Sequence, residues 1–203
     1  MSGENVPEKR ILLYIPIVHT ETDMGNLGGL VSKANLKKLG LLGWKQKRAQ
    51  VSRVWTYIEE ALARRMPRGR TIRLYQDSLP VCGREADIVR DLGGKGSRNH
   101  QLLLRLMEKG AVLMGTESAE LLLEEYELAK MTIAEEVITP AAETESRQEV
   151  LSDLILKQRD RFIADRINNT LLAGETGILF IGVLHSLDEL LAPDIRVERL
   201  FES

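Results

Sequence analysis

The chain of 203 residues has the length of a single domain, and its 43% hydrophobic and 29% charged residues exclude disorder and fibrous repeats. Its 28 basic and 30 acidic residues give a net charge of −2, which excludes the broad basic surface typical of duplex-binding proteins. Only 4% of the residues are aromatic, which argues against stacking on single strands. We therefore expect no nucleic-acid partner.

Cysteine content and hydropathy bear on the expected cellular location of the protein. Cys82 is the single cysteine, so one chain forms neither an internal disulfide nor a thiolate metal cluster. The first ten residues lack the apolar core of a signal peptide, and no apolar run approaches the roughly 20 residues that span a bilayer. The expectation is a cytoplasmic protein with no membrane partner.

The first expected element is a strand at 11–18, an apolar run that suits burial on both faces, with Pro16 near its end. A glycine-rich irregular loop at 20–43 follows, which we expect to be a flexible lid, and then a helix at 45–66. The remaining elements alternate in the same way. We expect strands at 71–77, 111–117, 178–185 and 195–201, and helices at 85–92, 98–109, 118–131 and about 147–173.

Strands that alternate with helices indicate βαβ units. The prediction is a single α/β domain over 1–203, a three-layer αβα fold with a mostly parallel sheet. A surface connection is expected at 132–146, which contains Pro140. The leucine runs at 102–104 and 121–123 are expected in the core, with a homodimer interface as the alternative.

Side chains with useful chemistry follow the ends of four expected strands. These are His19, Asp77, Glu117 and His185, and Glu21 lies two residues beyond His19. Because ligands bind beyond the carboxyl ends of parallel strands, we expect these side chains to share a site. Imidazole and carboxylate groups are suitable ligands for a divalent metal such as Mn, Co or Zn.

Each of these residues also has a purely structural interpretation. A histidine after a strand commonly forms hydrogen bonds within a loop, and Asp77 or Glu117 would cap a following helix. His100 lies in a polar helix start and is expected to be solvated. The glycine-rich stretches at 25–29 and 93–97 lack the spacing of nucleotide-binding loops, so we expect turns or lid segments there.

Three short segments resemble motifs of a known superfamily. Gly182-Val183-Leu184-His185 resembles the G-x-x-H motif of TraB/PrgY pheromone-shutdown proteins and TIKI proteases. TraB-like proteins end their first strand in a second G-x-x-H, where this chain has Pro16-Ile17-Val18-His19. Residues 159–167, RDRFIADRI, resemble the helix pattern R-N-x-x-M-A-x-x-I, with aspartate for asparagine and isoleucine for methionine. The order and spacing of these segments agree from residue 11 to about 200.

The resemblance implies an αβα sheet with a site lined by histidine, glutamate and arginine. The superfamily includes metal-dependent hydrolases (TIKI), metal-free ester hydrolases (the erythromycin-esterase-like proteins) and haem-binding ChaN-like proteins. Arg159 would then neutralise an oxyanion or a substrate carboxylate, and helix and strand lengths place it level with His185. A structural ion pair is the alternative role for Arg159.

The sequence thus favours a hydrolase that acts on a peptide or ester bond of a small-molecule or peptide substrate. His19 and His185 would hold the divalent metal or activate water. Glu117 would supply a further ligand or the general base, with Glu21 and Asp77 as alternates. The rival hypothesis is a non-catalytic module that binds or senses a small ligand or peptide at the same place.

Overall fold

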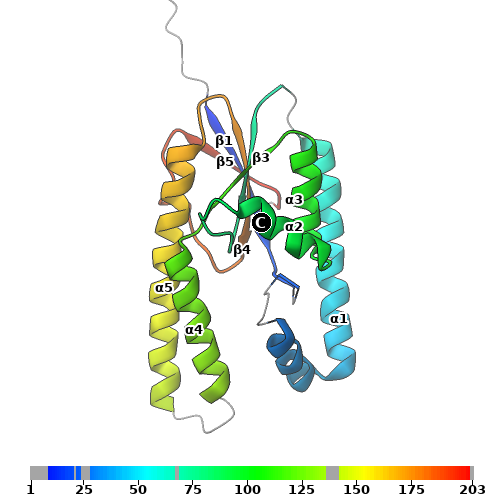
Figure 1. The fold of residues 1–203 in the computed structure, drawn as a ribbon, viewed down its shortest axis with the longest axis vertical. Coiled ribbons are helices and arrows are strands. Elements are labelled where there is room, and N and C mark those ends of the chain that lie inside the picture. Colours follow the sequence, from blue (N-terminus) through cyan, green and yellow to red (C-terminus); the bar gives the residue numbers. More distant parts are fainter. Residues whose placement is uncertain (1–8, 21, 24–27, 67–68, 136–141, 202–203) are drawn as a thin grey trace, which may run out of the picture.

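Five parallel strands form one sheet in the order β3-β2-β4-β1-β5 (Figure 1). The computed structural model describes residues 9–20, 22–23, 28–66, 69–135 and 142–201. The strands are β1 (Arg10–Ile17), β2 (Ile72–Gln76), β3 (Val112–Met114), β4 (Thr176–Gly182) and β5 (Ile195–Arg199). The prediction of an α/β fold with a parallel sheet is confirmed.

Helices cover both faces of the sheet. They are α1 (Gly28–Arg65), α2 (Glu85–Gly94), α3 (Arg98–Glu108), α4 (Ala119–Glu135) and α5 (Ala142–Thr170). Helices α1, α2 and α3 pack on one face, and α5 packs on the other with α4 alongside it (Figure 1). Within the described ranges, no helix has the length and apolar character needed to cross a membrane.

The two faces of β1 belong to separate apolar cores, because successive side chains of a strand point to opposite faces. Leu13 packs in one core with Trp55 of α1. Leu12 packs in the other core with Ile163 and Ile167 of α5. All five side chains are at least nine-tenths buried, so the sheet and its two helical layers are held in a fixed register.

The expected irregular lid at 20–43 is wrong for residues 28–43, which belong to α1. Gly40, with φ 67° and ψ 172°, forms a kink that divides α1 into two helical parts. Leucine, lysine and alanine around it are strong helix formers and outweigh the preference of the glycines for irregular structure. Residues 21 and 24–27 lie outside the described residues, so the lid stays a prediction there.

The expected surface connection at 132–146 is also wrong at both of its ends. Helix α4 continues to Glu135, and α5 already begins at Ala142. Alanine and glutamate dominate these two flanks, and both favour helix. Residues 136–141 lie outside the described residues.

The two leucine runs have different environments. Leu102 and Leu103 lie in the core beside α1, as predicted. Leu123 of α4 is instead 61% exposed, so the prediction of a core position is wrong for this residue. Helix α4 therefore presents apolar surface to solvent.

Candidate functional site

Residues that follow four different strands meet at the carboxyl edge of the sheet. Nε2 of His19, beyond β1, lies 2.9 Å from Oδ2 of Asp77, beyond β2. Nε2 of His185, beyond β4, lies 3.5 Å from the same oxygen. The sequence placed these residues at one edge, and the structure puts both histidines against one carboxylate. Glu21 lies outside the described residues.

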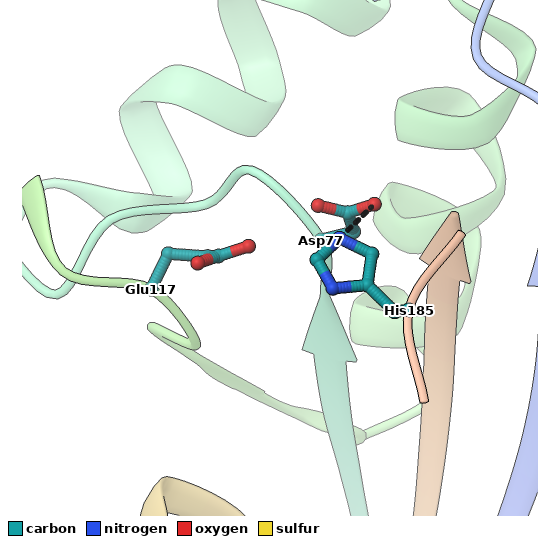
Figure 2. Close-up of side chains that lie close together, drawn as sticks. All are labelled: Asp77, Glu117 and His185. Atoms are coloured by element: carbon teal, nitrogen blue, oxygen red, sulfur yellow. Dashed lines mark ion pairs between the residues drawn. The ribbon is translucent and has the colours of Figure 1, made fainter. Parts of the chain in front are cut away.

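Asp77, Glu117 and His185 form a compact group in which each side chain offers one possible ligand atom. These atoms all lie within 4.8 Å of one another, and the three residues are buried. Figure 2 shows Glu117 and His185 directed toward Asp77 from separate segments of the chain. Glu117 lies three residues beyond the end of β3 and pairs with Pro80 in an isolated bridge, which fixes its backbone.

Arg159 of α5 joins the carboxylates of this group. Its Nη2 donates to Glu117 Oε1 at 2.6 Å and to Asp77 Oδ1 at 2.8 Å. Its Nη1 donates to Glu125 of α4 at 2.6 Å, and the side chain is only 4% exposed. Arg159 precedes Ile163 by one helical turn, so both face the sheet. This is the ion pair considered as the structural alternative, and a role of Arg159 toward substrate stays a prediction.

Two participants were missed by sequence reasoning, Asp160 and Glu125. Asp160 Oδ1 lies 2.5 Å from Nδ1 of His185, and its Oδ2 accepts from the backbone N–H of Ser186 at 3.1 Å. A carboxylate on Nδ1 fixes the ring and directs Nε2 toward Asp77. Asp160 occupies the asparagine position of the quoted helix pattern, which was a usable signal. No sequence signal pointed to Glu125, because its position depends on how α4 packs against α5.

Gly182, the glycine of the G-x-x-H segment, positions the carboxylate of Asp77. The Gly182 N–H donates to Asp77 Oδ2 at 2.8 Å. A Cβ at this position would lie 2.8 Å from the same oxygen and 3.6 Å from Nε2 of His19. The first distance is far below van der Waals contact, so a side chain here displaces the carboxylate that both histidines contact.

Gly182→Ala is therefore expected to lower the free energy of unfolding by about 1–3 kcal/mol, the usual cost of overpacking, and to weaken cation binding. Gly94→Ala is the matched control, because its Cβ meets nothing within 4 Å and alanine favours a helix. Urea denaturation and cation titration of both variants check the prediction. Equal behaviour of the two variants would show that the glycine is not needed for close packing.

The site holds more negative than positive charge. Asp77, Glu117 and Asp160 are buried carboxylates, and Arg159 is a buried guanidinium, so 1 − 3 gives −2 while both imidazoles are neutral. Buried charge is costly unless it is balanced. Protonation of the histidines or of Glu117, or binding of one divalent cation, reduces this negative charge.

The pKa values follow from this imbalance. Burial alone would lower the pKa of His19 and of His185, but the hydrogen bonds and charge of Asp77 outweigh it and raise both. Burial opposes ionisation of Asp77, yet the two histidines hold its pKa well below the ordinary value. Burial raises the pKa of Glu117, and Arg159 offsets this only in part. The group therefore favours bound positive charge.

A second polar cluster fastens the segment after β1 to the start of α3. Ser97 caps α3, and its Oγ lies against Asp23 and 2.7 Å from Nδ1 of His100. His100 is 5% exposed, so the expectation that it is solvated is wrong; it packs inward with Ser97. Thr20 also donates to Asp23, at 2.6 Å from its backbone N–H. This cluster stabilises the chain next to His19.

Asp23 is expected to make the free energy of unfolding fall at acidic pH. Burial opposes its ionisation, but hydrogen bonds from His100, Ser97 and Thr20 lower its pKa to about 2. A folded-state pKa below the unfolded value gives stability that is present above the unfolded pKa and lost as the pH falls toward 2. The loss amounts to about 2 kcal/mol.

Urea denaturation between pH 6 and pH 2.5 checks this expectation. Asp23→Asn should lose stability at neutral pH and show a weaker acid dependence than the wild type. Asp153→Asn removes an exposed carboxylate of α5 and is the control, with the acid dependence of the wild type expected. An unchanged acid dependence in Asp23→Asn would contradict the assignment.

Comparison of the chain with models of known protein families, with curated proteins and with solved structures gives no match. The likeness to TraB/PrgY and TIKI proteins therefore stays a resemblance of short motifs. Any function for the site must be argued from its own geometry and charge.

Proposed function

We propose that this protein is a hydrolase that binds a divalent cation through Asp77, Glu117 and His185 and cleaves an ester or peptide bond. The observation that carries the proposal is the buried charge imbalance of −2 around three convergent ligand atoms. One divalent cation removes that imbalance without protonating either histidine. Mn²⁺, Co²⁺ and Zn²⁺ are the candidates, because carboxylate and imidazole ligands suit them.

The arrangement of the ligand atoms supports the proposal. Two ligands on opposite sides of such a cation are separated by about 4.2 Å, twice a bond of about 2.1 Å. The ligand atoms of Asp77, Glu117 and His185 lie within 4.8 Å of one another, so small rotations suffice. His19 contacts the same oxygen of Asp77 and is a candidate fourth ligand. Asp160 would hold Nδ1 of His185 and leave Nε2 for the cation.

A bound cation would polarise the scissile carbonyl and lower the pKa of an attacking water. Glu117, whose pKa is raised by burial, would hold the cation through one carboxylate oxygen and accept a proton from this water through the other. Glu117 would then pass this proton to the leaving group. His19 would contact the substrate, because its side chain is 27% exposed and those of Asp77 and His185 are at most 4% exposed. Arg159 positions Glu117 and Asp77 through its hydrogen bonds to both.

A non-catalytic ligand-binding module is the second candidate, and burial favours it. Arg159, Asp77, Glu117 and His185 are nearly inaccessible, and each engages other protein groups. A cation held there would organise the sheet edge while the ligand binds beside His19. Both candidates predict a bound cation, and only the hydrolase predicts turnover.

Elemental analysis of protein purified without a histidine tag, followed by assays on esters, peptides and phosphoesters with and without Mn²⁺, Co²⁺ and Zn²⁺, tests the proposal. We expect about one equivalent of cation and hydrolysis of an ester or peptide, both lost in Asp77→Asn and retained in Asp153→Asn. Cation binding without turnover would support the binding module. Absence of a cation would overturn the metal site, and hydrolysis insensitive to chelators would leave a His–Glu mechanism.

A further inference from the structure

One stretch of α1, residues 36–50, is exposed at every position except Gly43 and Trp44, which are half-buried. No residue between 36 and 50 is buried, and a kink at Gly40 divides α1 there into two helical parts. Helices in proteins normally gain most of their stability from packing one face. This stretch, the basic segment below, therefore has surface available for a further contact.

The basic segment combines positive charge with exposed leucines. Residues 36–50 contain five basic and no acidic side chains. Leu41 and Leu42 beside the kink are 58% and 72% exposed. Exposed apolar side chains within a strongly charged helix are typical of a surface that meets an acidic, partly apolar partner.

The outer parts of α4 and α5 have the opposite character. Residues 119–132 and 148–158, the acidic hairpin face below, contain six acidic and two basic side chains, a net charge of −4. Leu123 and Val150 are 61% and 66% exposed, and further exposed apolar side chains flank them. Those are Met131, Leu151 and Leu154. The charge of this face is opposite to that of the basic segment, and both surfaces carry exposed apolar side chains.

One chain cannot bring its own two surfaces together. Helix α1 packs on one face of the sheet and α5 on the other, so the sheet separates them. Figure 1 shows that the α4–α5 pair and the lower end of α1 both extend past the carboxyl edge of the strands, in the same direction. A second molecule can therefore supply an acidic hairpin face for the basic segment of the first.

We propose that two copies of this chain form a symmetric dimer through these two surfaces. Two-fold symmetry makes both contacts identical, so each basic segment meets the partner's acidic hairpin face and the assembly closes. A second copy is the occupant that the charges favour, because it supplies the complement of both surfaces at once. An acidic partner would complement the basic segment alone. The dimer does not depend on the proposed hydrolase activity.

Charge reversal tests the dimer without disturbing either core. The first variant combines Lys37→Glu, Lys38→Glu and Lys45→Glu, and the second combines Glu124→Lys, Glu149→Lys and Asp153→Lys. All six residues are exposed. In a homodimer of either variant, both contacts join like charges. In the mixed dimer, the acidic segment of the first variant meets the basic hairpin of the second, and both contacts join opposite charges.

Sedimentation equilibrium is expected to give a dimer for the wild type, a monomer for each variant and a one-to-one heterodimer for their mixture. Arg196→Glu changes an exposed charge on β5 and should stay dimeric. Circular dichroism shows whether each variant is folded. A monomeric wild type, or a mixture that stays monomeric, would overturn the proposal. Binding of a monomeric wild type to anionic vesicles, lost in the first variant, would overturn it in favour of a membrane contact.

Discussion

Arg159→Met is expected to lower the free energy of unfolding by about 3–5 kcal/mol at neutral pH. The change leaves Asp77 and Glu117 buried without the cation that joins them, and uncompensated buried charge has this cost. Arg166→Met is the matched control on the same helix. Arg166 donates to the carbonyl of Gly115 at 3.2 Å and contacts no carboxylate of the cluster, so about 1 kcal/mol is expected.

The pH dependence of the Arg159→Met defect has a definite sign. Burial already raises the pKa of Glu117, and loss of Arg159 raises it further. A carboxyl whose folded-state pKa lies above its unfolded value destabilises the protein once it ionises, so stability is recovered as the pH falls. The difference between wild type and variant is therefore expected to shrink between pH 7 and pH 4, as measured by urea denaturation.

A second substitution separates lost charge from lost packing. Glu117→Gln in the Arg159→Met background removes one unpaired charge, and the double variant is expected to be more stable than Arg159→Met alone. Arg159→Lys retains a positive charge but not the planar fork, so its defect should be intermediate. Equal defects in Arg159→Met and Arg166→Met would mean that the ion pairs do not hold the site together.

The sequence predicts the core of the site because parallel strands share one carboxyl edge. His19, Asp77, Glu117 and His185 arrive at that edge whatever the order of the strands, so their convergence needs only the alternation of strands and helices. The height of Arg159 follows from the rise per residue of a helix and a strand. These inferences depend on the spacing of apolar residues and on the lengths of helices and strands, both of which can be read from the sequence.

Other features depend on packing that no local pattern states. Asp160 reaches His185 only because of the rotation of α5 on the sheet, and Glu125 reaches Arg159 only because α4 lies against α5. The error at 28–43 has another cause. Glycines there were expected to prevent helix formation, whereas the intervening residues favour helix and only Gly40 departs from helical geometry. The exposure of Leu123 likewise depends on which face of α4 packs against the rest of the protein.

Asp160→Asn is expected to reduce cation affinity about 10–100-fold while the fold is retained. Asp160 accepts two hydrogen bonds, from the Nδ1–H of His185 and from the backbone N–H of Ser186. An amide has one accepting oxygen in place of two, so one of these bonds is lost and the ring is less firmly oriented. The substitution also removes the carboxylate whose hydrogen bond raises the pKa of His185. That pKa should therefore fall in the metal-free protein.

Cobalt titration and imidazole NMR of the metal-free protein measure the two effects separately. The chain has three histidines, so the His185 resonances are assigned by comparison with His185→Gln. Asp165→Asn removes an exposed carboxylate from the same helix and is expected to change neither the affinity nor the His185 pKa. Lower affinity with an unchanged pKa would assign Asp160 to orientation alone. An unchanged affinity would mean that His185 does not bind the cation through the ring held by Asp160, and the ligand set would reduce to the carboxylates and His19.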